Sequence, residues 1–155
     1  MSKAFTLIEL IFVIILIGII AGVGSSMFKT NYLLNDTQYI MSKIHQAQYE
    51  GIGYEHQNFD GTFISDNRGC ITFTKEKLDD NASVSGGKYS LHVSINHSSL
   101  TSDTICFDAK GRPHDGDFTQ GSLLKEQKVL KLIYSNQTNQ IIIEPITGYA
   151  IIKYN

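Results

Sequence analysis

The chain has very little arginine and lacks the short motifs that mark catalytic or metal sites. Its 155 residues include 11 lysines but only two arginines, and the net charge is -2. Arginine supplies most bidentate contacts to phosphate, so this composition gives little support for a nucleic-acid surface. The five histidines show no HxxxH or HxH spacing, and no GxSxG turn is present. A nucleophile needs a base beside it on a rigid turn, so we expect no enzyme, no cofactor and no metal site.

One segment of the chain is rich in aspartate. Residues 108–117 combine three aspartates with glycine, as oxygen-ligand loops for Ca²⁺ do. The segment has neither the EF-hand spacing nor the closing glutamate. We therefore interpret it as a solvated loop rather than a metal site.

The longest apolar run covers residues 5–28 and carries a single charge, Glu9. As a helix that rises 1.5 Å per residue, it would measure about 36 Å, enough to cross a hydrocarbon core of about 30 Å. The run therefore predicts a segment that spans a membrane or inserts into it. A carboxylate within such a segment costs about 2.5 to 3.5 kcal/mol on insertion scales, so Glu9 needs a partner and is a candidate functional residue.

The start of this run resembles the class III leader of type IV pilins and type II secretion pseudopilins. Residues 1–4 form a short basic tag that ends in a small residue, and Phe-Thr-Leu-Ile-Glu-Leu follows at once. The resemblance implies that prepilin peptidase cuts between Ala4 and Phe5 and methylates the Phe5 amino group. It also implies that Glu9 is the assembly residue, which neutralises the Phe5 amino group of a neighbouring subunit. Most such leaders end in glycine, where this chain has Ala4.

Two other interpretations of the N-terminus remain open. In a secretory signal, residues 10–20 would be the hydrophobic region and residues 21–24 the small-residue cleavage site. The product would be a periplasmic binding protein, and Glu9 would have no task. A plain single-span anchor would also leave Glu9 unexplained. The shared register of the basic, small, aromatic and acidic residues favours the pilin-like leader.

The apolar run is followed by a second helical pattern. Leu33, Ile40, Ile44 and Ala47 recur on one helical face, and residues 51–53 read Gly-Ile-Gly, a stop signal. Beyond them the pattern changes to turns and short strands. Strands are predicted over residues 62–65, 70–74, 88–96, 104–108, 129–134, 140–144 and 149–153.

The predicted fold is therefore α+β, with one long N-terminal helix packed on an antiparallel β-sheet domain of pilin-like type. The first half of the helix would lie in the membrane and the second half in the periplasm. The expected parts are a leader (1–4), a transmembrane and assembly helix (5–28), the periplasmic half of the helix (29–53) and a globular β-rich periplasmic domain (54–155).

The two cysteines, Cys70 and Cys106, both fall in this globular domain. They lie on the far side of the membrane if Lys3 stays in the cytoplasm, as the positive-inside tendency asks. That compartment is oxidising, which favours a disulfide between them. Two buried thiols on neighbouring strands are the alternative.

Two C-terminal segments are similar to those of H-type minor pseudopilins and T-type fimbrial minor pilins, the GspH/FimT-like group. Residues 105–113 look like their strand and Gly-Arg turn, and residues 141–149 like their final Thr-Gly hairpin. The similarity implies a low-copy subunit at or near the tip of a filament. In some T-type members a basic C-terminal motif binds DNA. Lys110 and Arg112 are the only cations in the corresponding turn and lie near three aspartates, so they form a weak nucleic-acid candidate.

Together these features predict a minor pseudopilin or minor pilin, a structural subunit of a type II secretion pseudopilus or type IV pilus. It would be a single-pass protein of the bacterial inner membrane with its C-terminal domain in the periplasm, and would enter a filament after processing. The expected partners are prepilin peptidase, other pilin subunits and the lipid bilayer, whereas nucleic acid is not expected. A DNA-uptake minor pilin and a signal-cleaved periplasmic binding protein are the alternatives.

Overall fold

The computed structural model describes residues 7–27, 31–54, 66–80, 83–84 and 87–154, with side chains except at 23–27, 80, 83–84 and 87–88. The chain forms two compact units, residues 1–31 and 32–155. Ala4 and Phe5, the residues of the predicted cleavage site, and the strand predicted at 62–65 lie outside the described residues.

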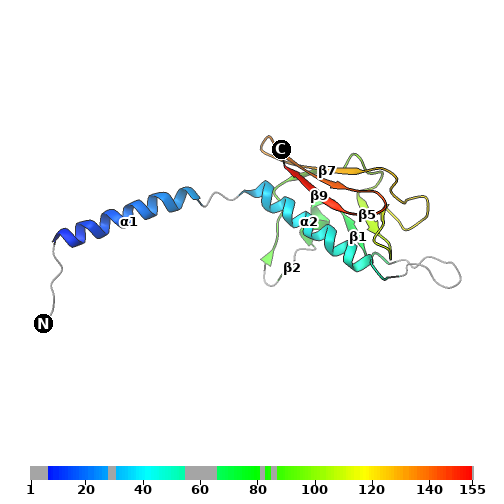
Figure 1. Ribbon diagram of the computed structural model, residues 1–155, viewed down its shortest axis with the longest axis horizontal. Coiled ribbons are helices and arrows are strands. Elements are labelled where there is room, and N and C mark those ends of the chain that lie inside the picture. The colour runs from blue at the N-terminus through cyan, green and yellow to red at the C-terminus, as the bar shows by residue number, and fades with distance from the viewer. Residues whose placement is uncertain (1–6, 28–30, 55–65, 81–82, 85–86, 155) are drawn as a thin grey trace. The chain divides into compact units, whose positions relative to one another are not determined.

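The first unit contains helix α1 (Leu7–Met27; Figure 1). Over residues 7–22 its side chains are apolar all round except for Glu9. In this range its large aliphatic and aromatic side chains are all exposed, from 41% for Val13 to 76% for Leu7 and Ile8. Glu9 lies in the first turn, where a carboxylate is favoured by the positive end of the helix dipole. Within its own unit, α1 therefore leaves a wide apolar surface uncovered.

The predicted long helix with a membrane-spanning half is wrong. The helical residues belong to two helices in different units, because α1 ends at Met27 and α2 covers Tyr32–Gly51. Among the described residues, no helix combines the length and the apolar character that a membrane crossing requires. This finding contradicts the predicted single-pass location in the inner membrane with a periplasmic domain.

The second unit is built around α2, which buries one face. The predicted stripe lies on this face, and two polar residues share it. The buried residues of α2 are Leu33, Asp36, Thr37, Ile40, Ile44, Ala47 and Gly51.

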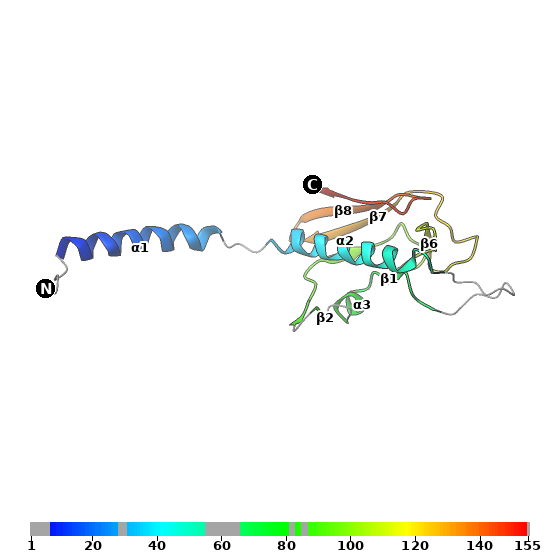
Figure 2. The ribbon, with the colours of Figure 1, turned by 60° about the horizontal axis from the view of Figure 1, so that its bottom comes forward.

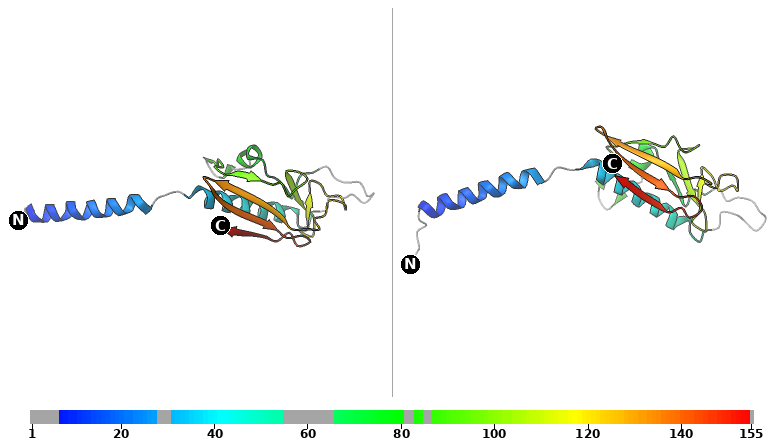
Figure 3. Two further views of the ribbon diagram at one scale, coloured as in Figure 1. Left: turned by 90° about the horizontal axis from the view of Figure 1, so that it is seen from above. Right: turned by 45° about the horizontal axis from the view of Figure 1, so that its top comes forward.

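Two antiparallel sheets and a short ribbon surround α2, which confirms the predicted α+β class. The four-stranded sheet has the order β4-β7-β8-β9 (Ser94–Asn96, Lys128–Tyr134, Gln137–Ile143, Ala150–Tyr154). The three-stranded sheet has the order β1-β5-β6 (Cys70–Thr72, Thr104–Phe107, Pro113–Asp115). Helix α3 (Lys75–Asp80) and the ribbon of β2 (Ser83–Val84) and β3 (Gly87–Lys88) complete the unit. Figure 2 shows α2 between the four-stranded sheet and α3, and Figure 3 shows β9, in red, at the margin of that sheet.

The hydrophobic core lies entirely within this second unit. Its buried members run from Leu33 to Ala150 and include Phe73, Phe107 and the inward residues of β7 and β8. Because residues of this unit pack into one cluster with many fully buried members, the domain of residues 32–155 has what it needs to fold on its own.

The strand predicted over residues 88–96 is reduced to β4. Leu91 and Val93 are buried and His92 is exposed, so the alternation predicted the burial correctly. The backbone N–H groups of His92 and Val93, however, donate to Oδ2 of Asp36 at 2.6 and 3.0 Å. These groups are occupied by a carboxylate and cannot pair with a neighbouring strand.

Other differences between the predicted and the observed elements occur where polar residues, which are typical of loops, belong to regular structure. The five-residue loop predicted between β7 and β8 is a turn at Ser135 and Asn136, both with positive φ (44° and 66°), and β8 already begins at Gln137. Asn139 looks like a loop residue, but its Nδ2 donates to Thr37 Oγ1 at 3.1 Å in the interior. Helix α3 and β2 lie in a predicted loop, and β6 was not predicted because it starts at Pro113.

Asp36 is fully buried and joins α2 to the segment that precedes β4. Besides the two backbone N–H groups, it accepts a hydrogen bond from the Tyr89 hydroxyl at 2.6 Å. Burial and this hydrogen bond both raise the pKa of Tyr89, so its hydroxyl remains a donor. Three donors thus replace the water that the carboxyl group loses on folding.

Replacing Asp36 should destabilise the domain strongly. We expect Asp36→Ala to lower the free energy of unfolding by about 3 kcal/mol or more, because buried donors lose a charged acceptor. Tyr89→Phe removes one donor only and should cost about 1–2 kcal/mol. Urea unfolding of residues 31–155 measures both, and a loss below about 1 kcal/mol for Asp36→Ala would contradict this role.

Candidate functional site

The predicted Gly-Arg turn and the Thr-Gly hairpin meet at the end of α2. Gly148 has a φ of +67°, and a Cβ there would lie 2.5 Å from the carbonyl oxygen of Gly111. Gln48 of α2 donates through Nε2 to the carbonyl oxygens of Gly111, at 3.5 Å, and Thr147, at 3.3 Å. The two segments singled out in the sequence therefore form one structural junction, fastened by a helix side chain.

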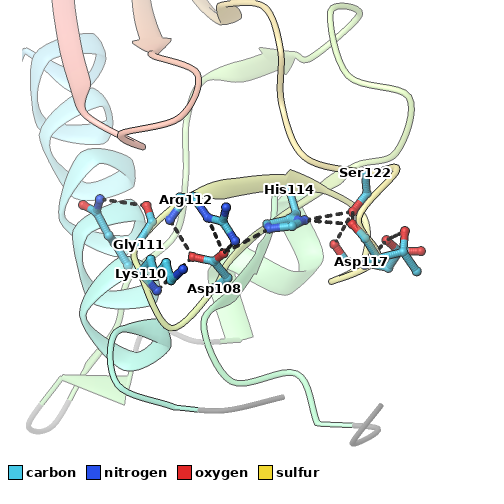
Figure 4. Close-up of polar contacts among 9 residues, drawn as sticks. Asp108, Lys110, Gly111, Arg112, His114, Asp117 and Ser122 are labelled. Carbon is cyan, nitrogen blue, oxygen red and sulfur yellow. Dashed lines mark hydrogen bonds and ion pairs between the residues drawn. The ribbon is translucent and has the colours of Figure 1, made fainter. Parts of the chain in front are cut away.

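Within the turn, Arg112 is held by Asp108 (Figure 4). Its Nε and Nη2 lie 2.7 and 2.6 Å from Asp108 Oδ2. The backbone N–H groups of Lys110 and Arg112 donate to Oδ1 at 2.9 and 2.8 Å. The Asp108 side chain is only 15% exposed, so this is a partly desolvated pair rather than a surface contact.

The Asp108 contacts lower its pKa. Burial alone raises the pKa, but the hydrogen bonds from the Arg112 side chain and from the Arg112 and Lys110 backbones, with the Arg112 charge, outweigh burial. The pKa in the folded protein is therefore below the ordinary value of 3.8. Asp108 contributes stability that is complete above the unfolded pKa and is lost as the pH falls through the lowered folded value.

The contacts of Asp108 affect the predicted nucleic-acid role of Lys110 and Arg112. Lys110 and Arg112 do lie on one turn, and Lys110 is exposed. Asp108 occupies the Nε and Nη2 donors of the Arg112 guanidinium, so a phosphate group would have to displace it to bind at that edge. The assignment of Lys110 and Arg112 to nucleic-acid binding stays a prediction.

His114 on β6 links Asp108 to Ser122, an arrangement that the sequence did not reveal. Its Nε2 lies 3.5 Å from Asp108 Oδ2, and its Nδ1 lies 3.0 Å from Ser122 Oγ (Figure 4). Nδ1 also lies 3.2 Å from the carbonyl oxygen of Thr119. The Ser122 hydroxyl lies within donating distance of the carbonyl oxygens of Asp117, at 2.8 Å, and Thr119, at 2.7 Å, so these contacts fasten the turn.

The burial of His114 follows from strand pairing. On β6 it stands opposite Cys106 of β5, with its side chain only 5% exposed. No local alternation in the sequence marks this burial, because Pro113 and His114 are both buried and the strand begins at a proline.

The three aspartates of residues 108–117 serve separate partners. Asp115 accepts the backbone N–H groups of Thr101 and Ser102 at 2.8 and 3.0 Å, and Asp117 accepts that of Thr119 at 3.0 Å. Within the described part of the chain, no three His, Cys, Asp or Glu side chains are grouped as metal ligands.

The predicted disulfide between Cys70 and Cys106 is confirmed. The two residues are direct partners in the β1–β5 ladder, which is why the bond forms there. Cys70 also borders a hollow of about 190 Å³ beside α2, whose other lining residues are Lys43, Gln46, Ala47, Glu50, Ile71 and Leu78.

The processing and assembly residues belong to the first unit. Glu9 is exposed in the first turn of α1, while Ala4 and Phe5 lie outside the described residues. Cleavage between Ala4 and Phe5, methylation of Phe5 and the assembly role of Glu9 all stay predictions.

Lys110 and Arg112 should differ in their effect on stability. We expect Arg112→Ala to lower the free energy of unfolding by about 1 kcal/mol at pH 7 and Lys110→Ala to change it by less than about 0.5 kcal/mol. The difference between wild type and Arg112→Ala should shrink as the pH falls from 4 to 2, because Asp108 becomes protonated. Urea unfolding over this pH range measures it, and equal effects of the two substitutions would refute the assignment.

Comparison with known proteins identifies no family for the chain. No protein-family model, no curated protein and no solved structure matches it. The resemblance to pilin-like proteins therefore rests on the N-terminal and C-terminal residues alone.

Proposed function

We propose that the chain is a structural subunit of a pilin-like filament, a minor pilin or minor pseudopilin, in which α1 packs against the corresponding helices of neighbouring subunits. The observation that carries the proposal is the uncovered apolar surface of α1. A continuous apolar surface of this size on a folded protein marks an interaction site. The domain of residues 32–155 has a complete core without α1, so the helix is available for contacts with other chains.

Other helices of the same kind are the partners that fit α1 best. A helix that is apolar all round is stable when it is surrounded on all sides, which a bundle of like helices provides. Each Leu or Ile side chain removed from water contributes roughly 1.5–3 kcal/mol, so a few contacts are enough to hold a subunit.

Glu9 would set the register of this packing. Apolar contacts are not directional, so they allow one helix to slide along another at little cost. A carboxylate that meets an ammonium group in an apolar setting fixes one position, because either charge alone would be costly to bury. The leader resemblance supplies the partner, since cleavage between Ala4 and Phe5 by prepilin peptidase would create a new amino group on Phe5.

The N-terminus of the mature chain provides the first test. We expect mass spectrometry and sequencing of the protein from cells that contain prepilin peptidase to show a chain that begins with N-methylated Phe5. A chain that begins near residues 21–25 would mean that α1 is removed, and would replace the filament subunit by a secreted binding protein.

The assembly role of Glu9 is tested by matched substitutions. Glu9→Gln should reduce the amount of the chain recovered in sheared filaments by at least about tenfold, because breaking a buried ion pair costs about 3–5 kcal/mol. Glu50→Gln makes the same chemical change at an exposed site of α2 and should leave incorporation unchanged. Normal incorporation of Glu9→Gln would show that Glu9 is not the registering residue.

A further inference from the structure

The four-stranded sheet ends in an apolar edge strand with little protection. β9 is bonded to β8 on one side, and within the described part of the chain no strand pairs with its other side (Figure 3). Edge strands are commonly protected from other chains by prolines, bulges or several charges. β9 keeps an unbroken register over five residues, contains no proline and carries a single charge, Lys153.

Alternation along β9 shows which backbone groups face the open side. The Glu144 N–H donates to the Tyr149 carbonyl at 2.9 Å, and the β8–β9 register continues from this pair without a bulge. Every second residue of an antiparallel strand bonds to the same neighbour, so Ile151 and Lys153 bond to β8. Three residues direct their N–H and C=O groups to the open side: Ala150, Ile152 and Tyr154.

Strand β7, beyond the residues that pair with β4, confirms this alternation. By the same reasoning Val129 of β7 directs its N–H and C=O groups away from β8. Both groups are bonded to the Ser99 hydroxyl, which accepts at 3.0 Å and donates at 2.9 Å. The alternation assigned from the register is therefore the one that the hydrogen bonds show.

We propose that β9 pairs with β9 of a second copy of this chain, antiparallel about a two-fold axis at Ile152, so that the two sheets become one. In this register Ala150 stands opposite Tyr154 of the second copy, and Ile152 stands opposite its own equivalent. The N–H and C=O groups that Ala150, Ile152 and Tyr154 direct to the open side are then all bonded to the second copy. Shifting the register by two residues shortens the overlap and, in one direction, places Lys153 opposite Lys153.

The side chains fit this register on both faces. On the inner face the smallest residue, Ala150, stands opposite the largest, Tyr154, which is 55% exposed in the single copy. On the outer face Ile151 stands opposite Lys153, whose aliphatic stem can cover it. No like charges stand opposite each other, which is the arrangement that cross-strand pairing favours.

This dimer goes beyond the proposed filament and is independent of it. A two-fold interface uses the same patch on both copies and closes on itself, whereas a filament needs a contact that repeats. The dimer depends on β9 alone and the filament contact on α1. A monomeric domain would therefore leave the filament proposal untouched, and failed filament assembly would leave the dimer untouched.

The test measures the association of the domain of residues 31–155 by sedimentation at increasing protein concentration. Wild type should form a dimer. Ile151→Lys places a lysine opposite Lys153 twice and should weaken the dimer by about tenfold. Adding Lys153→Glu turns both repulsive pairs into attractive ones and should restore association. Lys131→Glu, on the same face but two strands from the edge, is the control and should change nothing.

Cross-linking tests the register without relying on a charged variant. Ile151→Cys and Lys153→Cys domains, mixed and oxidised, should form a mixed disulfide because the two positions are opposite neighbours, within the reach of a disulfide. Each variant alone should cross-link weakly. A wild type that stays monomeric, an unweakened Ile151→Lys dimer, or failure of both the charge rescue and the mixed cross-link would overturn the proposal.

Discussion

The folded domain depends on the burial of one carboxyl group in α2. Asp36 lies among the apolar residues of the helix and accepts hydrogen bonds from Tyr89, His92 and Val93. A polar group can be buried at this depth only when donors replace the lost water, so the helix and the segment before β4 must fold together. That segment leads into β4, which pairs with β7, and the position of the four-stranded sheet on α2 follows from the same contact.

Periodicity in the sequence predicts the parts of this domain that depend on local pattern. The stripe of α2 and the strands β5, β7 and β9 are found close to where the periodicity places them. The segment before β4, whose N–H groups bond to Asp36, alternates between buried and exposed side chains as a strand does, but it is not a strand. What decides its conformation is a carboxylate more than fifty residues away, and no local pattern contains that information. Asp36 and Thr37 did leave one signal, because both fall on the buried face of the helical stripe.

In the candidate site, too, the local turn could be predicted from the sequence, whereas the contacts between elements could not. The sequence placed Lys110 and Arg112 on one turn correctly, yet it could not show that Asp108 holds the guanidinium of Arg112. His114 is buried because β6 pairs with β5, a pairing hidden by the proline at its start. The apolar run and the stripe that follows it favoured one continuous helix, whereas α1 ends at Met27, in a unit separate from α2.

The disulfide has a mechanical consequence for a chain that is pulled from its ends. Cys70 and Cys106 are 36 residues apart, so the segment between them cannot lengthen while the bond is intact. At about 3.5 Å per extended residue, roughly 120 Å of chain is withheld from stretching. The strand β5, the ribbon and α3 border or lie within this closed loop. A domain under tension would therefore reach its full extension early, and the covalent bond would take the load in place of the hydrogen bonds between β1 and β5.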